Sequence, residues 1–339
     1  MGEVYAALDV SDKSTQVCVV DGSGAEVWAG VCPTDPEAIT TTLRKRAPAL
    51  ARVILETGPL SAFLYHGLAE RGVPVVCVCA RHAHGVLKAR VNKSDVHDAA
   101  GLAQMARTGW FKAIHIKDEA THMVRAALKI REQLVASHRA MANQLRGLLK
   151  LFGLRLGKVT TPNKRRERLE ALFDQRPGLR ELAGPLVESL EALETQIARS
   201  SRRLAATASA DPVASRLMSA PGVGPICALT FKTAIEDPGR FDRGEDVGAF
   251  AGLAPRRSQS GEKDVRGRIS KAGDPMLRSV LYEAANSLLG RVKRPCALRD
   301  WGLALAIRKG PKRARVAVAR KLAVLLHRLW QSEEAFRWA

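Results

Sequence analysis

The chain has 339 residues, of which 46% are hydrophobic and 26% charged, and its formal net charge at neutral pH is +20. This length and apolar content exclude a disordered chain and allow two or three domains, each with its own core. The excess of 54 Lys and Arg over 34 Asp and Glu favours a polyanionic partner, nucleic acid first, over a surface that is only solubilising.

The first 31 residues predict a three-stranded meander. Strands VYAALDV, TQVCVVD and AEVWAGV are separated by the turns SDKS and GSG. A helix over residues 36–46, the strand RVILET, the helix SAFLYHGLAERG and the strand VPVVCVCA follow. This alternation predicts an α/β domain with a mixed sheet, followed by a helix over residues 94–108.

Two long helical runs come next, over residues 118–153 and 165–208. Both carry apolar residues near three-four spacing and few helix breakers. They fit an antiparallel helical arm or coiled-coil hairpin, and two core helices of a bundle explain the pattern equally well. Residues 209–339 read as mostly helical and basic.

Four carboxylates stand at the ends of predicted elements. Asp9 ends the strand AALDV, Glu56 ends VILET, and Asp95 and Asp98 open the helix in KSDVHDAAGLAQMAR. Residues three apart share a helix face, so Asp95 and Asp98 can both point toward the sheet. Read singly, Asp95 is a helix N-cap, Asp98 a favourable first-turn acid, and the other two ordinary turn residues.

Read together, the four carboxylates favour a metal site. A buried carboxylate at a strand end must be solvated, paired or bound to a metal, and hard oxygen ligands suit Mg²⁺ or Mn²⁺. Their order around a meander resembles the RNase H and RuvC type of nuclease fold. In that type, carboxylates gather two divalent ions that activate a nucleophile and stabilise a leaving oxygen.

The segment SAPGVGP, at residues 219–225, lies between two helical stretches. Gly222 and Gly224 would let backbone amides approach a phosphate at a helix N-terminus. The segment resembles the hairpin of helix-hairpin-helix DNA-binding modules, although a plain turn between helices also explains it.

Positive charge is concentrated near the C-terminus. Residues 251–321 hold 18 Lys and Arg against 5 Asp and Glu, which gives +13 of the total +20. Within them, Ser258 and Ser260 lie in a predicted polar loop whose cations are Arg256, Arg257, Lys263, Arg266, Arg268 and Lys271. Guanidinium groups can hold a phosphate against a serine hydroxyl, but the residues alone favour a solvated Ser-Gly loop.

These motifs together resemble a known family. The chain is similar to insertion-sequence transposases with an Asp-Glu-Asp-Asp tetrad, the IS110 family and its IS1111 branch. The similarity rests on the four carboxylates, the segment PGVGP, the run GLAPRRSQSGEKDVRGRISKAGDPMLRSVLYEAA and the later helix GPKRARVAVARKLAVLLHRLW. The similarity covers nearly the whole chain. One departure is Asp274, where many members have Asn.

The resemblance implies three domains: a RuvC-like metal-binding nuclease domain at residues 1–115, a coiled-coil arm at 116–208, and a C-terminal transposase domain at 209–339. It implies that Asp9, Glu56, Asp95 and Asp98 bind Mg²⁺ or Mn²⁺, and that Ser260, or as second choice Ser258, is the nucleophile of a DNA recombinase. Nucleic acid would be contacted by Gly222, Gly224, Arg256, Arg257, Lys263, Arg266, Arg268, Lys271, Arg278, Lys312, Arg313 and Arg315.

The implied partners are donor and target DNA, a noncoding bridge RNA and further copies of the chain in a dimer or tetramer. The alternatives are a RuvC-like nuclease or junction resolvase that uses water, and a DNA-binding protein without activity. No basic leader and no long apolar stretch are present, so we expect a bacterial cytoplasmic, nucleoid-associated protein with no membrane contact. The six cysteines lack zinc-site spacing and are expected to be reduced core thiols.

Overall fold

The computed structural model describes residues 2–87, 95–159, 161–261 and 263–338. The chain divides into two compact units, Met1–Asp118 and Glu119–Ala339. Each unit is described by itself below.

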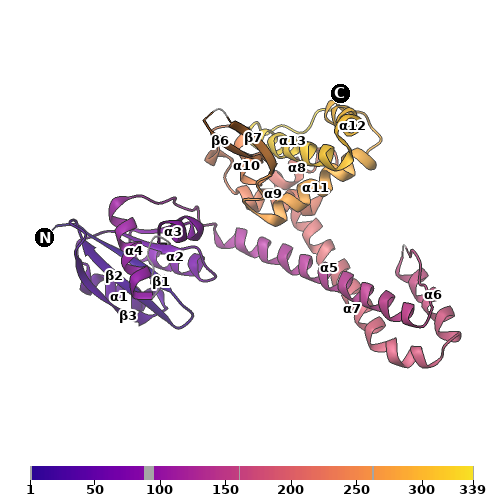
Figure 1. The fold of residues 1–339 in the computed structure, drawn as a ribbon, viewed down its shortest axis with the longest axis horizontal. Helices are drawn as coiled ribbons and strands as arrows, with labels where there is room; N and C mark the ends of the chain where they lie inside the picture. Colours follow the sequence, from indigo (N-terminus) through magenta and orange to yellow (C-terminus); the bar gives the residue numbers. More distant parts are fainter. Residues whose placement is uncertain (1, 88–94, 160, 262, 339) are drawn as a thin grey trace. The chain divides into compact units, whose positions relative to one another are not determined.

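A five-stranded mixed sheet forms the centre of the first unit (Figure 1). The strand order is β3-β2-β1-β4-β5. The first three strands form an antiparallel meander, while β4 runs parallel to β1 and β5 parallel to β4. The prediction of a mixed sheet is confirmed, with strand bounds β1 Val4–Val10, β2 Ser14–Asp21, β3 Glu26–Pro33, β4 Leu50–Glu56 and β5 Val75–Val78.

Helices pack on both faces of this sheet. On one face, α1 (Pro36–Arg46) and α2 (Ser61–Glu70) share a core with the strands. On the other face lies α4 (Asp95–Thr108). A short helix, α3 (Ala80–Leu87), precedes α4 and was not predicted, because it has only eight residues and contains a glycine, which disfavours helix.

Two helices of equal length run along each other at the start of the second unit. These helices, α5 (Glu119–Leu151) and α7 (Gly178–Ala210), are antiparallel. Arg131 Nε donates to Ser201 Oγ at 2.8 Å, and His138 Nε2 lies 3.0 Å from Glu194 Oε1. As the residue number rises on one helix it falls on the other.

The sequence predicted one helix over residues 165–208, and the structure corrects this. A separate helix, α6 (Pro162–Asp174), is followed by a break before α7. Pro177 lies at this break, and a proline disfavours helical backbone at the residue before it. Arg165 pairs with Glu194, which fastens α6 to α7.

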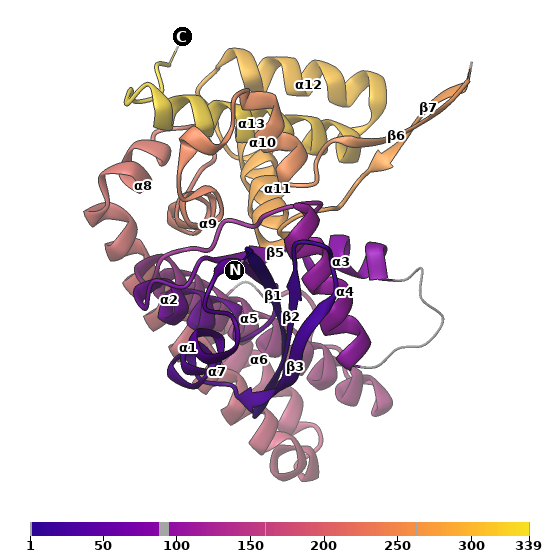
Figure 2. The same ribbon diagram turned by 90° about the vertical axis from the view of Figure 1, so that its left-hand side faces the viewer.

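The rest of the second unit is mainly helical, with one antiparallel hairpin. The hairpin, β6 (Pro255–Ser260) and β7 (Lys263–Ile269), extends away from the surrounding helices (Figure 2). The sequence predicted a loop here, because these strands show no alternation of apolar and polar residues. The helices are α8 Pro212–Leu217, α9 Pro225–Ile235, η1 Pro238–Arg240, α10 Gly244–Phe250, α11 Pro275–Gly290, α12 Ala297–Lys309 and α13 Pro311–Gln331.

A single core holds these helices together. Phe231 of α9, Leu281 of α11 and Leu322 of α13 are fully buried within it. Within the described ranges, no helix is long and apolar enough to cross a membrane.

The cysteines are free thiols, and five of the six are buried. Burial raises the pKa of Cys77 to about 11 and that of Cys227 to about 12, so both are protonated at neutral pH. The prediction of core thiols is confirmed.

Candidate functional site

Asp9 and Glu56 lie side by side at the carboxyl ends of two neighbouring parallel strands. The register pairs Leu8 of β1 with Leu55 of β4, and each carboxylate is the next residue along its strand. Both residues line one pocket of about 160 Å³, together with Ser11, Asp12 and Ser61. The two predicted strand-end acids are therefore brought together.

The alternation of side chains along the strands decides which face they occupy. Leu8 and Leu55 belong to the core under α1 and α2, whereas Ala7 and Ile54 belong to the core under α4. Successive residues of a strand point to opposite faces. Asp9 and Glu56 thus belong to the face that α4 covers.

The direction of α4 places its amino end near these two carboxylates. At its carboxyl end, Gln104 Nε2 donates to Gly24 O at 2.7 Å and Arg52 Nη1 donates to Ala106 O at 2.9 Å. Gly24 lies in the β2–β3 turn, which follows Asp21, the partner of Val4 at the opposite end of β1 from Asp9. A helix of 14 residues spans about 21 Å and a strand of seven about 23 Å, so α4 reaches back to the Asp9 end.

Asp98 lies in the first turn of α4 on the side that faces the sheet. It is half-buried and one turn before Leu102, which is buried in the core beneath α4. The side chain of Asp95, like all of Ser94, lies outside the described residues. Among those that are described, no three His, Cys, Asp or Glu side chains are placed to hold one metal ion.

The two candidate serines lie on the exposed β6–β7 hairpin. Ser258 is opposite Val265 and Ser260 opposite Lys263, and both serines are exposed. They alternate with Arg257 and Gln259, so both hydroxyls emerge on one face of the hairpin. Gly261, with φ of +54°, turns the chain directly after Ser260.

The cations of the hairpin differ in how they are engaged. Arg257 donates from Nε to Asp264 Oδ1 at 2.7 Å, and Arg256 Nη2 donates to Ser270 O at 3.3 Å. Within the described ranges, the others have no ion-pair or hydrogen-bond partner through their side chains and remain available to an anion: Lys263, Arg266, Arg268 and Lys271.

The base of the hairpin is closely packed against neighbouring backbone. A Cβ on Gly252 would lie 2.4 Å from Ala272 O, and one on Gly273 would lie 2.0 Å from Phe250 O, so only glycine fits at either position. Arg278, expected to contact nucleic acid, donates from Nη1 to Ala251 O at 3.2 Å.

Asp274, the residue after Gly273, links the start of α11 to α5. Its Oδ1 accepts from Met276 N and Leu277 N at the start of α11, and its Oδ2 accepts from Arg125 Nη2 of α5 at 2.5 Å. The sequence missed this ion pair because its partners are 149 positions apart.

The two glycines of the PGVGP turn have different surroundings. Gly222 has φ of +83°, and a Cβ there would lie 2.5 Å from Ala284 O of α11. Gly224 is the N-cap residue of α9, with open space around it. Close packing against α11 accounts for Gly222, whereas Gly224 leaves the start of α9 accessible. Three more predicted nucleic-acid contacts lie in the first turns of α13, where Lys312 and Arg313 are exposed and Arg315 is half-buried.

Sequence reasoning also missed a groove of about 1170 Å³ in the second unit. Its walls come from α10, the two ends of the hairpin, α12, α13 and the C-terminal tail, segments that no local pattern connects. Arg313, Arg320 and Arg328 recur on α13 at helical spacing, and this was the one signal in the sequence.

Comparisons with known proteins match most of the chain. A family model described as "Transposase", DEDD_Tnp_IS110, matches residues 6–153, and a second, "Transposase IS116/IS110/IS902 family", matches residues 214–301. The transposase for insertion sequence element IS1111A of Coxiella burnetii is 29% identical over 97% of this chain and 90% of its own length. A probable family 20 transposase of Pseudomonas aeruginosa is 30% identical over 73% of this chain and 74% of its own.

Proposed function

Because the chain belongs to the IS110 family of insertion-sequence transposases, we propose that it cuts and rejoins donor and target DNA through a phosphoserine intermediate. Action on DNA follows from membership of a transposase family. The divalent metal ion, the serine nucleophile and the RNA guide are our proposals. The observation that carries the proposal is the placement of Asp9 and Glu56 at the ends of adjacent parallel strands, facing the start of α4.

A RuvC-like fold for the first unit is part of this proposal. Its support is the antiparallel meander followed by two parallel strands, with carboxylates at the ends of the first and fourth strands and Asp98 on the helix that covers them. The proposed domains are residues 1–115, 116–208 and 209–339.

The donor set fits a divalent cation. Asp9, Glu56 and Asp98 offer only carboxylate oxygens, and Asp95 adds a fourth carboxylate from the same turn of α4, which suits Mg²⁺ or Mn²⁺. Bound there, such an ion would polarise the scissile phosphodiester and stabilise the leaving oxygen. These four residues would hold it.

Ser260 is the proposed nucleophile, with Ser258 as the second choice. The Ser260 Oγ gives up its proton and forms a bond to phosphorus, while the scissile P–O bond breaks and leaves a hydroxyl at the end of one DNA strand. A second strand end then displaces the serine and restores its hydroxyl. Lys263 is paired with Ser260 across the hairpin, so its side chain lies on the same face and would hold the phosphate against Oγ.

The serine and the carboxylates belong to different units of the chain, so the proposal includes assembly of the active site in a homo-oligomer, a dimer or tetramer. It also includes a noncoding bridge RNA as guide. The net charge of +20 supports binding of two polyanions.

The nucleophile is tested by incubating the protein with donor DNA, co-purified RNA and Mg²⁺ and resolving it on a denaturing gel. We expect wild-type protein and Ser258→Ala to give a covalent protein–DNA adduct and Ser260→Ala to give none. An adduct from Ser260→Ala would show that this assignment is wrong. Nicked DNA without any adduct from wild-type protein would identify the water-dependent nuclease instead.

The carboxylates are tested in the same assay. We expect Asp98→Asn and Glu56→Gln to abolish both nicking and adduct, because each removes a charge from the metal ligands. Glu37→Gln, an exposed acid on α1 of the same unit, is the matched control and should retain both. If Asp98→Asn gave nicking and adduct at the wild-type level, Asp98 would be only a favourable acid at the start of α4 and not a metal ligand.

A further inference from the structure

The groove of about 1170 Å³ in the second unit has an apolar floor and a cationic rim. Its floor is made by aliphatic residues of α12 and α13, with Trp301 on one wall and Phe336 of the C-terminal tail on another. Five cations line it against a single carboxylate, Glu245; the cations are Arg313, Arg320, Lys321, Arg328 and Arg337.

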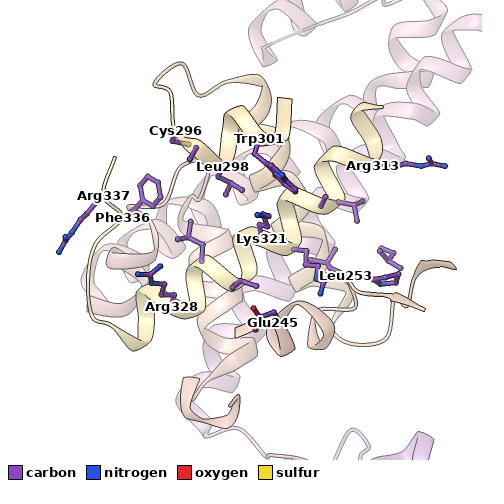
Figure 3. Close-up of a pocket in the computed structure, with 18 residues that line it drawn as sticks. Glu245, Leu253, Cys296, Leu298, Trp301, Arg313, Lys321, Arg328, Phe336 and Arg337 are labelled. Atoms are coloured by element: carbon purple, nitrogen blue, oxygen red, sulfur yellow. The ribbon is translucent and has the colours of Figure 1, made fainter. Parts of the chain in front are cut away.

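The cations are spread along the groove and most of them are uncommitted. Figure 3 places Trp301 and Lys321 between Arg313 at one end and Arg328, Phe336 and Arg337 at the other. In the part of the chain that the structure describes, no carboxylate or hydrogen-bond acceptor engages the side chains of Arg313, Arg320 or Arg328. Lys321 Nζ lies 4.4 Å from the centre of the Trp301 ring.

This combination selects among nucleic acids. A duplex presents phosphates outward and stacks its bases inside, so it would meet the cations and leave the apolar floor uncovered. An unpaired strand presents both, because its phosphates pair with the cations while its bases stack on aromatic side chains. The described side chains that line the groove include no hydroxyl, amide or imidazole group, and Glu245 is the one carboxylate among them that could accept from a ribose 2′-hydroxyl.

The groove is also continuous with the hairpin that carries the candidate serines. Pro255, the first residue of β6, and Ile269, the last of β7, both line it. We propose that the groove binds an unpaired single strand of DNA and leads it to the base of the β6–β7 hairpin. That the strand is led toward the β6–β7 hairpin rests on the proposed function, because this hairpin carries the proposed nucleophile. The binding of a single strand in the groove does not rest on it.

Binding is measured with the full-length protein by fluorescence anisotropy, without Mg²⁺. The probes are a labelled oligothymidylate of about 12 nucleotides, an oligouridylate of the same length and the corresponding DNA duplex. We expect the wild-type protein to prefer oligothymidylate to oligouridylate. Trp301→Ala should weaken oligothymidylate binding by about 5- to 150-fold, the range for loss of one stacked base, with a smaller effect on the duplex.

Matched variants separate the groove from the rest of the surface. Trp301→Phe should retain most of the affinity, because it still stacks, and Arg320→Gln with Arg328→Gln should lower it without touching the core. Arg308→Gln, an exposed arginine of α12 outside the groove, should bind like the wild type. Thermal unfolding of each variant separates lost binding from lost folding.

Two results would overturn the proposal. The first is that the Arg320→Gln, Arg328→Gln double variant and folded Trp301→Ala both bind oligothymidylate like the wild type. The groove would then not be a single-strand site and would fit a protein segment instead. Tighter binding of oligouridylate would assign the groove to RNA, and equal binding would refute its preference for DNA. Ser260→Ala should bind oligothymidylate normally, so failure of the serine assignment and failure of the groove are distinguishable.

Discussion

Asp274 shows how one side chain can hold two elements together. It caps α11 through two backbone amides and pairs with Arg125 of α5. Burial would raise the pKa of Asp274, but the hydrogen bond and the charge of Arg125 outweigh burial and leave this pKa below its usual value. Asparagine at this position would keep the cap and lose the ion pair.

We therefore expect Asp274→Asn to lower the free energy of unfolding by about 1–2 kcal/mol at neutral pH, mostly through the lost charge-assisted hydrogen bond. Because the folded-state pKa is depressed, this difference is fully present above the unfolded pKa of about 3.9 and disappears as pH falls through the folded value. Urea unfolding across pH measures it. In a double-mutant cycle with Arg125→Gln, strict additivity of the two changes would show that the pair contributes nothing.

At the scale of elements, the turn between α8 and α9 is held against α11 by a glycine. A Cβ on Gly222 would meet Ala284 O at 2.5 Å and Leu288 N at 2.9 Å, both backbone atoms of a helix that cannot move aside. The positive φ of +83° adds strain for any other residue.

Gly222→Ala should accordingly destabilise the second unit by about 2–3 kcal/mol or more, through overpacking and backbone strain. Gly224→Ala, two residues on in open space, should change stability by no more than about 0.5 kcal/mol. Thermal unfolding of the two variants provides the comparison. Equal stability of both would contradict the close approach to α11, and weaker DNA binding by stable Gly224→Ala would support a phosphate contact at the start of α9.

The sequence pattern predicted helices and strands where one face of the element is buried, because burial makes apolar residues recur at a fixed spacing. The strands of the sheet and the long helix α5 were placed within a few residues, because apolar residues repeat along them. The β6–β7 hairpin was not, because almost every one of its side chains is exposed and its strands are held by backbone pairing and the Arg257–Asp264 pair. The break before α7 was also missed, although Pro177 marks it.

At the scale of the whole molecule, the sequence predicted which carboxylates stand at strand ends but not how they meet. That Asp9 and Glu56 share one face depends on the register of β1 with β4, and the approach of Asp98 depends on the direction of α4. Both are set by contacts distant in sequence. The groove around Trp301 depends on five separate segments for the same reason.

Charge is the remaining property of the whole chain, and it predicts how DNA binding responds to salt. The net charge is +20, and residues 251–321 supply +13 of it. Each phosphate neutralised by a side chain releases counterions, so the logarithm of the binding constant should fall linearly with the logarithm of salt concentration. Arg266 and Arg268 are exposed on β7 with no side-chain partner among the described residues.

We expect Arg266→Gln and Arg268→Gln each to reduce the steepness of this line by about one unit on a DNA duplex, because each removes one phosphate contact. Lys45→Gln removes an exposed charge at the end of α1 in the first unit and should leave the slope unchanged. Filter binding or anisotropy over a salt series measures all three. If Lys45→Gln lowered the slope as much as the hairpin variants, net charge rather than the hairpin would account for binding, and the serine-bearing hairpin would lose its assigned contact with the DNA backbone.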